Sequence, residues 1–365
     1  MVSFIRIPHF RGETVKNLIS VHKPTIKRKD LEYVLNSMMQ DSIDYGEFAR
    51  NFEKRLSERS GCYDVLAVNS YYSAIDLVLE TLEINEGDEV IIPSFLPQVY
   101  LNVITKRKAI PVLVDLEMDY FQPSLESIRE AVTPKTKLLF LYYYFGYTYD
   151  SAPYLELVPN VVEDITSVLG AKSGENKIGS QGTYAIADFS TKGLITTGEG
   201  GAVFSPNRKA YHLLMSHVEK NYDIENFYPR LNCLIPDLNA AMGISQDETL
   251  NHRLKLLDII GKIYEESVKR GRNSIVAPKE NHEKYYTDFP ILVKSSLKDA
   301  VAYLKKNGIE GLRPLEYPLH QYLKLAKDKF PVTEHFYLGT LLIPIHSTLK
   351  KKDVDLISKV LATMI

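Results

Sequence analysis

The chain has 365 residues, of which 45% are hydrophobic and 25% are charged, and its formal net charge is −2. This composition is typical of a globular protein with one large or two moderate domains. The sequence has no basic stripe, which argues against a nucleic-acid or membrane-surface partner. No apolar run approaches the length of a membrane span.

The first residues lack the apolar core of a signal peptide. The two cysteines, Cys62 and Cys233, cannot form a disulfide framework, and no metal-ligand spacing is visible. We therefore expect a soluble cytoplasmic protein without a metal site.

Two helices are predicted first. Apolar residues recur at i, i+3, i+4 and i+7 in "DLEYVLNSMMQ" (30–40), which indicates a helix packed on one face. The segment "EFARNFEKRLSERSG" (47–61) predicts a second helix that ends at Gly61, a plausible C′ glycine.

Short apolar runs follow, each trailed by a helical or turn segment. Such runs predict a mostly parallel sheet covered on both faces. A tyrosine-rich run, "LYYYFGYTYD" (141–150), more often means a buried strand with polar-tipped side chains than a recognition surface. The predicted strands are "DVLAVN", "DEVIIP", "AIPVLVD", "KLLFLYYY", "NVVED", "TYAIADF" and "GGAVF".

A long amphipathic helix is predicted from about Asp247, followed by a smaller alternation of strands and helices. We expect a large α/β domain with a mixed, mostly parallel sheet over residues 1–246. A smaller C-terminal α/β domain is expected over residues 247–365.

In parallel sheets, ligands bind at the carboxyl ends of the strands. An acid, Asp164, ends one predicted strand, and Lys192 follows another, in "STKGLITTGEGG". Taken alone, that lysine could lie on a solvated turn. The convergence of an acid and a lysine on one rim argues against that interpretation.

A lysine in a crowded or desolvated site becomes a nucleophile, and pyridoxal 5′-phosphate is its most frequent covalent partner. This cofactor needs a carboxylate opposite its pyridine nitrogen, and an anion cradle such as a helix N-terminus. Lys192 could supply the lysine, and Asp164 could supply the carboxylate. The helix that opens in "NSYYSAIDLVLETL" (69–82) could supply the anion cradle.

Six segments in the same order resemble the DegT family of pyridoxal-phosphate-dependent nucleotide-sugar aminotransferases, which have the aspartate aminotransferase type of fold. The resemblance runs through almost the whole chain. The segments are "SIDYGEFARNFEKRLSERSG", "LAVNSYYSAIDL", "GDEVIIPSF" with "AIPVLVDLEMDYFQ", "VVEDITSVLGA", "STKGLITTGEGGAVF" and "LNCLIPDLNAAMGI".

The resemblance implies roles for individual residues. Lys192 becomes the Schiff-base lysine and proton shuttle, and Asp164 the partner of the ring nitrogen. Asn232 falls on the asparagine that contacts the cofactor phosphate from the other subunit, which implies a homodimer with shared active sites. His320 falls on a substrate-side histidine of the family, although a structural histidine is an equal alternative.

The cofactor-binding positions depart from the family pattern. Tyr71 and Tyr72 replace the Gly-Thr of the phosphate-binding helix start. Pro97 falls at or near the aromatic that stacks on the cofactor, and Ser167 replaces the Gln or His that faces its phenolic oxygen.

Ala187 or Asp188 falls where a phosphate-binding serine is expected. A carboxylate about 4 Å from a phosphate would repel it by about 4 kcal/mol at an effective dielectric of 20. Asp188 must therefore point elsewhere or bind a cation, or the phosphate must sit differently. Ser73, Ser190 and a hydroxyl of Tyr71 or Tyr72 could replace the lost donors.

The resemblance implies transfer of an amino group from an amino acid, expected to be glutamate, to a keto sugar carried on a nucleotide, in surface polysaccharide or other glycan biosynthesis. Two alternatives stay open. The chain could be a degenerate, non-catalytic member or partner subunit. It could also be a sugar dehydratase, although the family's dehydratases replace the lysine with histidine.

Overall fold

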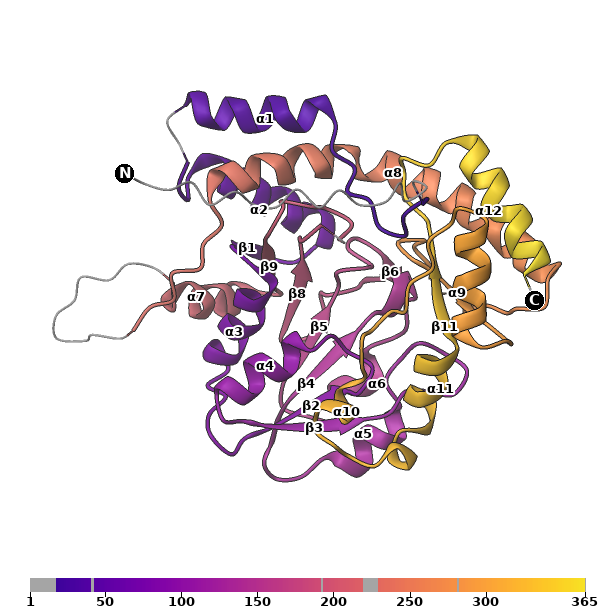
Figure 1. The fold of residues 1–365 in the computed structure, drawn as a ribbon. Coiled ribbons are helices and arrows are strands. Elements are labelled where there is room, and N and C mark those ends of the chain that lie inside the picture. The colour runs from indigo at the N-terminus through magenta and orange to yellow at the C-terminus, as the bar shows by residue number, and fades with distance from the viewer. Residues whose placement is uncertain (1–17, 41–42, 192, 219–228, 281, 365) are drawn as a thin grey trace, which may run out of the picture.

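The computed structural model describes residues 18–40, 43–191, 193–218, 229–280 and 282–364. Its centre is a seven-stranded sheet in the order β1-β9-β8-β5-β4-β2-β3 (Figure 1). Neighbours from β8 to β3 are parallel, and β9 is antiparallel to both β1 and β8. The strands are β1 (Asp64–Val68), β2 (Glu89–Pro93), β3 (Ile110–Val114), β4 (Thr136–Tyr142), β5 (Val161–Asp164), β8 (Tyr184–Asp188) and β9 (Gly201–Ser205). The predicted α/β class and mostly parallel sheet are confirmed, and each predicted run contains a strand.

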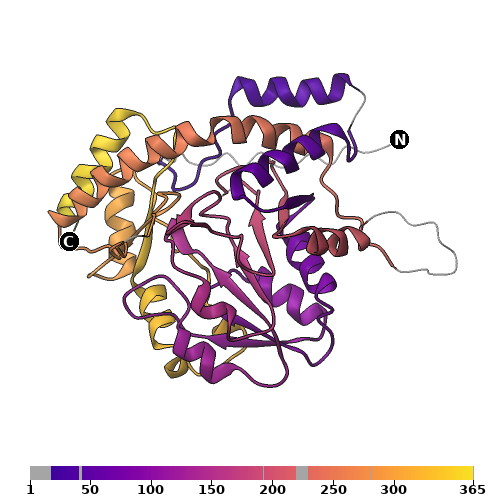
Figure 2. The same ribbon diagram turned by 180° about the vertical axis from the view of Figure 1, so that it is seen from behind.

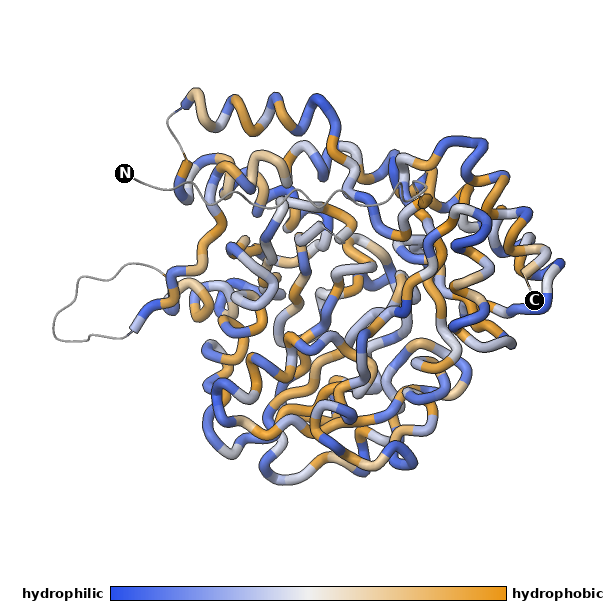
Figure 3. The backbone as a smooth tube through the Cα atoms, viewed as in Figure 1, coloured by the Kyte–Doolittle hydropathy of each residue, from blue (hydrophilic) through white to orange (hydrophobic). Residues whose placement is uncertain are grey.

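The central strands of the sheet are apolar on both faces, and helices cover both faces for that reason. Figure 3 colours the backbone by hydropathy, and hydrophobic residues are frequent along the buried strands. Helix α3 follows β1, and the side chain of its N-cap, Ser70, accepts a hydrogen bond from the N–H of Ser73. A short two-stranded hairpin, β6 (Lys172–Ser173) and β7 (Asn176–Lys177), lies outside the main sheet. The covering helices are α3 (Tyr71–Thr81), α4 (Val99–Lys106), α5 (Leu125–Ala131), α6 (Ala152–Leu155) and α7 (Arg208–Ser216).

Two N-terminal helices, α1 (Arg28–Met39) and α2 (Glu47–Ser60), pack along the long helix α8 (Asp237–Lys269). Helix α2 ends at Gly61, whose φ of +75° is the predicted left-handed C-cap. The prediction for α1 is wrong in one respect, because its apolar stripe does not pack on the chain. The side chains of Leu31, Leu35 and Met39 are exposed, and the buried residues of α1 are Asp30 and Ser37.

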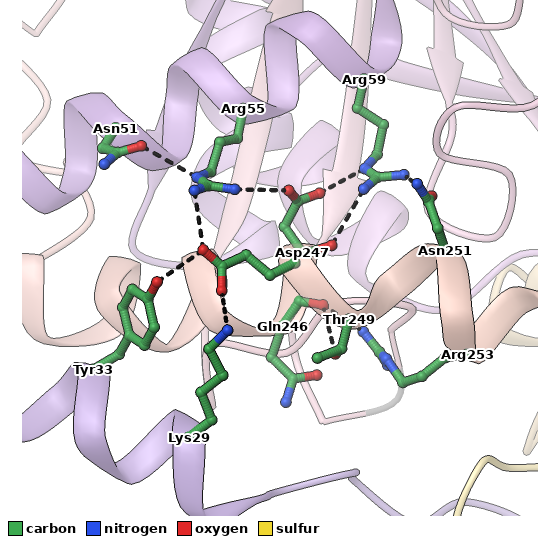
Figure 4. Close-up of polar contacts among 11 residues, drawn as sticks. Lys29, Tyr33, Asn51, Arg55, Arg59, Gln246, Asp247, Thr249, Asn251 and Arg253 are labelled. Atoms are coloured by element: carbon green, nitrogen blue, oxygen red, sulfur yellow. Dashed lines mark hydrogen bonds and ion pairs between the residues drawn. The ribbon is translucent and has the colours of Figure 1, made fainter.

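Charged groups, rather than that stripe, connect these helices (Figure 4). Arg59 of α2 donates from Nε to Oδ1 of Asp247 in α8 at 2.6 Å. The next residue, Glu248, is 2.6 Å from Nζ of Lys29 in α1 and 3.1 Å from Nη2 of Arg55 in α2. The three helices therefore form one layer above the edge of the sheet.

Helix α8 begins ten residues before the predicted start at Asp247. Its first turns are rich in small residues that let α2 approach closely, and a Cβ added at Gly243 would lie 2.6 Å from the ring of Phe52. Such a surface lacks the bulky apolar stripe that reveals a helix in a sequence. The expected domain boundary after residue 246 lies inside this helix.

Most of the C-terminal part of the chain, coloured orange to yellow, lies on the side of the molecule away from α7 (Figure 2). There, a second, smaller sheet pairs β10 (Phe289–Leu292) with β11 (Thr340–Ile343) in antiparallel register. It forms a separate hydrophobic cluster together with the second half of α8, and the division into two domains remains a prediction. The remaining helices are α9 (Leu297–Lys306), α10 (Leu319–Tyr322), α11 (Pro331–Gly339) and α12 (Lys351–Thr363), with the 3₁₀ turns η1 (Tyr144–Gly146) and η2 (Lys327–Lys329). Within the described residues, no helix is both long and apolar enough to span a membrane.

The tyrosine-rich run is buried as predicted, but only its start is a strand. Strand β4 ends at Tyr142, and Phe145 and Gly146 then adopt positive φ values of +54° and +79°. At Gly146 the backbone lies directly against Tyr285, where an added Cβ would be 1.8 Å from the carbonyl oxygen. The chain leaves the sheet at this turn, and the tyrosine rings remain in the core.

Candidate functional site

A cavity of about 680 Å³ opens at the carboxyl ends of β5 and β8. The two strands are parallel and in register, with Asp164 opposite Ile186. Polar side chains from several segments of the large sheet region reach its wall, as expected at the carboxyl edge of a parallel sheet. They include Tyr71, Thr166, Ser167, Asp188 and Ser190, and the C-terminal part of the chain adds Arg313, Glu316 and Tyr317.

Asp164, the last residue of β5, is buried with 1% exposure, and it bonds to two residues that line the cavity, Tyr71 and Thr166. Its Oδ1 accepts a hydrogen bond from the N–H of Thr166 at 3.0 Å. Its Oδ2 accepts from the hydroxyl of Tyr100 at 2.6 Å and from the hydroxyl of Tyr71. Burial raises the pKa of Asp164, whereas these hydrogen bonds oppose the rise.

The two tyrosines reach Asp164 from different helices. Tyr100 lies in α4 and is fully buried, and Tyr71 is the first residue of α3 and keeps partial exposure along the cavity. Their hydroxyl oxygens are 2.7 Å apart and their rings meet edge to face. Burial raises the pKa of both hydroxyls well above 10, so both are neutral donors.

The turn before Lys192 is held by Asp188. Its carboxylate accepts from the N–H and from the Oγ of Ser190 at 2.7 and 2.8 Å, and its own N–H donates to Oγ1 of Thr166 at 2.9 Å. Burial raises the pKa of Asp188. The carboxylate of Asp188 therefore points toward Ser190, which was the first of the three alternatives for it. The same contact uses the hydroxyl of Ser190 as a donor.

Lys192 lies outside the described residues. The residues on either side of it, Thr191 and Gly193, line the cavity. A Cβ added at Gly193 would lie 2.6 Å from the carbonyl oxygen of Asp188, so the turn packs closely on the end of β8.

The other predicted cofactor residues divide into two groups. Pro97 and Ser167 line the cavity. Tyr72 instead has Nζ of Lys106 over its ring, 5.4 Å from the centroid. Ser73 donates from Oγ to Oδ1 of Asn69 at 2.7 Å, within the helix start.

Asn232 lines a different cavity, of about 1050 Å³, beside Tyr45 and Glu53. It does not line the cavity at the ends of β5 and β8.

His320 is fully buried. Its Nδ1 is 2.8 Å from Oγ of Ser94, and its Nε2 is 2.8 Å from Oε1 of Glu334. These contacts connect α10 and α11 to the end of β2. They agree with the structural alternative for this histidine.

Sequence reasoning missed Tyr100, Arg313 and His22, although all three lie at the site or on its wall. Tyr100 could have been found from its position in the helix that follows the second strand end. Arg313 and His22 come from segments far apart in the sequence, which no local pattern brings together.

The residues present fit pyridoxal phosphate at its ring end. A buried carboxylate, Asp164, is the partner that a pyridine nitrogen requires. The cavity volume falls within the range of small-molecule sites, about 300–1,000 Å³. The hydroxyls of Tyr71 and Tyr100 both bond Oδ2, so a ring nitrogen that bonds this oxygen would displace one of them.

A family model described as the DegT/DnrJ/EryC1/StrS aminotransferase family matches residues 24–362. A relative named GDP-perosamine synthase, from Caulobacter vibrioides, is 29% identical over 355 residues, covering 92% of this chain and 95% of the relative. Another, from Saccharopolyspora spinosa, is named dTDP-4-dehydro-2,3,6-trideoxy-D-glucose 4-aminotransferase. It is 24% identical over 366 residues, covering 92% and 94% of the two chains.

Among solved structures, a putative sugar aminotransferase from Streptococcus pneumoniae in its PLP form superposes with a TM-score of 0.88. The superposition covers 94% of this chain and 98% of the other, at 23% identity. This likeness establishes that the two proteins share a fold.

Proposed function

The chain belongs to the DegT/DnrJ/EryC1/StrS aminotransferase family and is a sugar aminotransferase of glycan biosynthesis, and we propose that it transfers an amino group from an amino acid such as glutamate to a keto sugar carried on a nucleotide. The observation that carries the proposal is the buried carboxylate of Asp164, which bonds Tyr71 on the wall of a cavity that both neighbours of Lys192 also line. The acceptor is given as a class because relatives named for GDP-linked and dTDP-linked sugars both match along the chain.

We assign the cofactor roles as follows. Pyridoxal phosphate supplies an electron sink for the carbon that loses and gains the proton. Asp164 would hold the ring nitrogen in its protonated form, and Ser167 would face the ring oxygen. Lys192 would hold the cofactor covalently and carry the proton between carbon atoms.

The phosphate would rest on backbone N–H groups at the start of α3. The Ser70 side chain caps the N–H of Ser73, which leaves the N–H groups of Tyr71 and Tyr72 to a ligand. Backbone donors do not depend on side-chain identity, which accounts for how Tyr71 and Tyr72 can stand where the family has Gly and Thr.

We further propose a homodimer in which Asn232 contacts the cofactor phosphate of the partner subunit. The exposed apolar residues of α1, Leu31, Leu35 and Met39, support an interface on that side of the molecule. We place the enzyme in the cytoplasm, because Cys62 and Cys233 are free thiols.

Visible absorption of the full chain with added pyridoxal phosphate tests the function. We expect a band in the wild type that is lost in Lys192→Ala and kept in Lys209→Ala, a matched change of an exposed lysine on α7. Added glutamate should bleach the band. A wild-type protein without a band, or one whose band persists in Lys192→Ala, would contradict the proposal.

A further inference from the structure

We propose that Tyr71 is an internal competitor of the cofactor, because its hydroxyl holds the Asp164 oxygen that a pyridinium nitrogen must reach and has to leave when the ring binds. The inference rests on the proposed function and concerns how tightly and under what control the cofactor is held. It predicts a closed state without cofactor and an open state with it.

The carboxylate of Asp164 can accept only a few hydrogen bonds. Oδ1 of Asp164 is engaged by the N–H of Thr166, at the start of the segment after β5. Oδ2 already accepts two hydroxyl donors. A carboxylate oxygen offers about two lone-pair sites, so a third donor displaces one that is present.

Of the two hydroxyl donors, the one that can leave is Tyr71. Tyr100 has no exposed surface and packs edge to face on Phe140 of β4 with ring centroids 5.1 Å apart. Tyr71 is partly exposed and forms part of the cavity wall. Rotation of its side chain toward the cavity needs no movement of the sheet, whereas departure of Tyr100 would open the core.

The side chain of Tyr71 extends from the start of α3 to Asp164. It leaves the backbone at the first residue of α3, where the phosphate is expected, and ends on Asp164, where the ring nitrogen is expected. The side chain thus runs between the two anchor points of the cofactor. Tyr72, the next residue, packs with Lys106 instead and is not part of this competition.

The magnitude follows from the bond that is exchanged. A hydrogen bond to a charged group contributes enough that its loss weakens binding by at least about tenfold. Removal of the Tyr71 hydroxyl should therefore tighten binding of a pyridine ligand by about tenfold or more.

The probe is 4′-deoxypyridoxine 5′-phosphate, which carries the ring nitrogen and the phosphate but lacks the aldehyde, so its binding does not require Lys192. Isothermal calorimetry on the full chain would compare wild type, Tyr71→Phe, Tyr71→Ala and the matched control Tyr72→Phe. We expect Tyr71→Phe to bind at least about tenfold more tightly than wild type, and Tyr72→Phe to stay within about twofold.

A second readout follows the motion itself. The chain contains 24 tyrosines and no tryptophan, so its near-ultraviolet spectrum reports tyrosine environments. After subtraction of the free-ligand spectrum, binding should give a tyrosine difference signal in wild type that is smaller in Tyr71→Phe and unchanged in Tyr72→Phe.

Equal affinity of folded wild type and Tyr71→Phe would overturn the inference, and if Tyr71→Phe does not fold, the same comparison with Tyr71→Ala decides. A Lys192-dependent absorption band together with equal affinities would leave the proposed function standing without the competitor. No binding to any variant would overturn both.

Discussion

Replacement of Glu53 by glutamine should remove a pH dependence from the free energy of unfolding. Glu53 lies in α2 with 4% exposure. Its Oε1 accepts from the N–H of Ala67 in β1, and its Oε2 accepts from the hydroxyl of Tyr45, each at 2.9 Å. Burial raises the pKa of Glu53 to about 8, although the hydrogen bond from Ala67 opposes the rise.

The sign follows from proton binding. An unfolded chain releases this proton near pH 4.3, whereas the folded chain keeps it up to about pH 8. The stabilisation is therefore fully present below about pH 4 and is lost as the pH rises through about 8. Linkage gives a loss of about 2.5 kcal/mol between about pH 5.5 and about pH 7.5. For a chain of 365 residues this corresponds to about 3 °C in Tm.

Thermal unfolding followed by circular dichroism at the two pH values, at one protein concentration, measures the effect. Glu53→Gln keeps an acceptor for Ala67 and a group that can bond Tyr45, and it cannot titrate. The Tm of the wild type should fall by about 3 °C more than that of Glu53→Gln between the two pH values. Glu58→Gln, an exposed change on the same helix, should follow the wild type. Parallel pH profiles for wild type and Glu53→Gln would refute the reasoning.

Three further substitutions test the packing of the C-terminal part. Gly261→Ala in α8 would place a Cβ 2.1 Å from the ring of Tyr286 and should lower the free energy of urea unfolding by about 1–3 kcal/mol. Gly339→Ala, with no neighbouring atom within 4 Å, should cost at most about 0.5 kcal/mol, and equal losses would show that the close approach is not real. His320→Ala removes the buried ring that bonds both Ser94 and Glu334, and it should destabilise the chain by about 2 kcal/mol with the KM for the sugar unchanged. A raised KM at unchanged Tm would instead place His320 on the substrate.

The sheet could be predicted because each central strand is buried on both faces, which leaves a continuous apolar run in the sequence. The start of α8 could not, since small residues such as Gly243 fit against Phe52 only once α2 is in place. The exposed stripe of α1 illustrates the opposite error. Its periodicity correctly predicts a helix, but periodicity does not say which surface covers the apolar face.

Part of the candidate site could also be predicted from the sequence, and part could not. Asp164 could be placed at a strand end from the sequence, and it is the last residue of β5. That Tyr71 reaches this carboxylate could not be predicted, because the contact joins residues 93 positions apart on different elements. Sequence alone indicated two bulky rings at the helix start without indicating that one faces Asp164 and the other faces Lys106.

Helix α8 also sets an order for events during synthesis. Its 33 residues span about 50 Å and contribute Ala240, Ile244 and Leu250 to the larger hydrophobic cluster, and Leu257 and Tyr264 to the smaller one. A nascent chain that has emerged only as far as residue 246 therefore lacks part of the wall of its first core. We therefore expect the large sheet region to complete its fold only after the helix has left the ribosome, and we expect a fragment that ends at residue 246 to bind chaperones rather than to fold by itself.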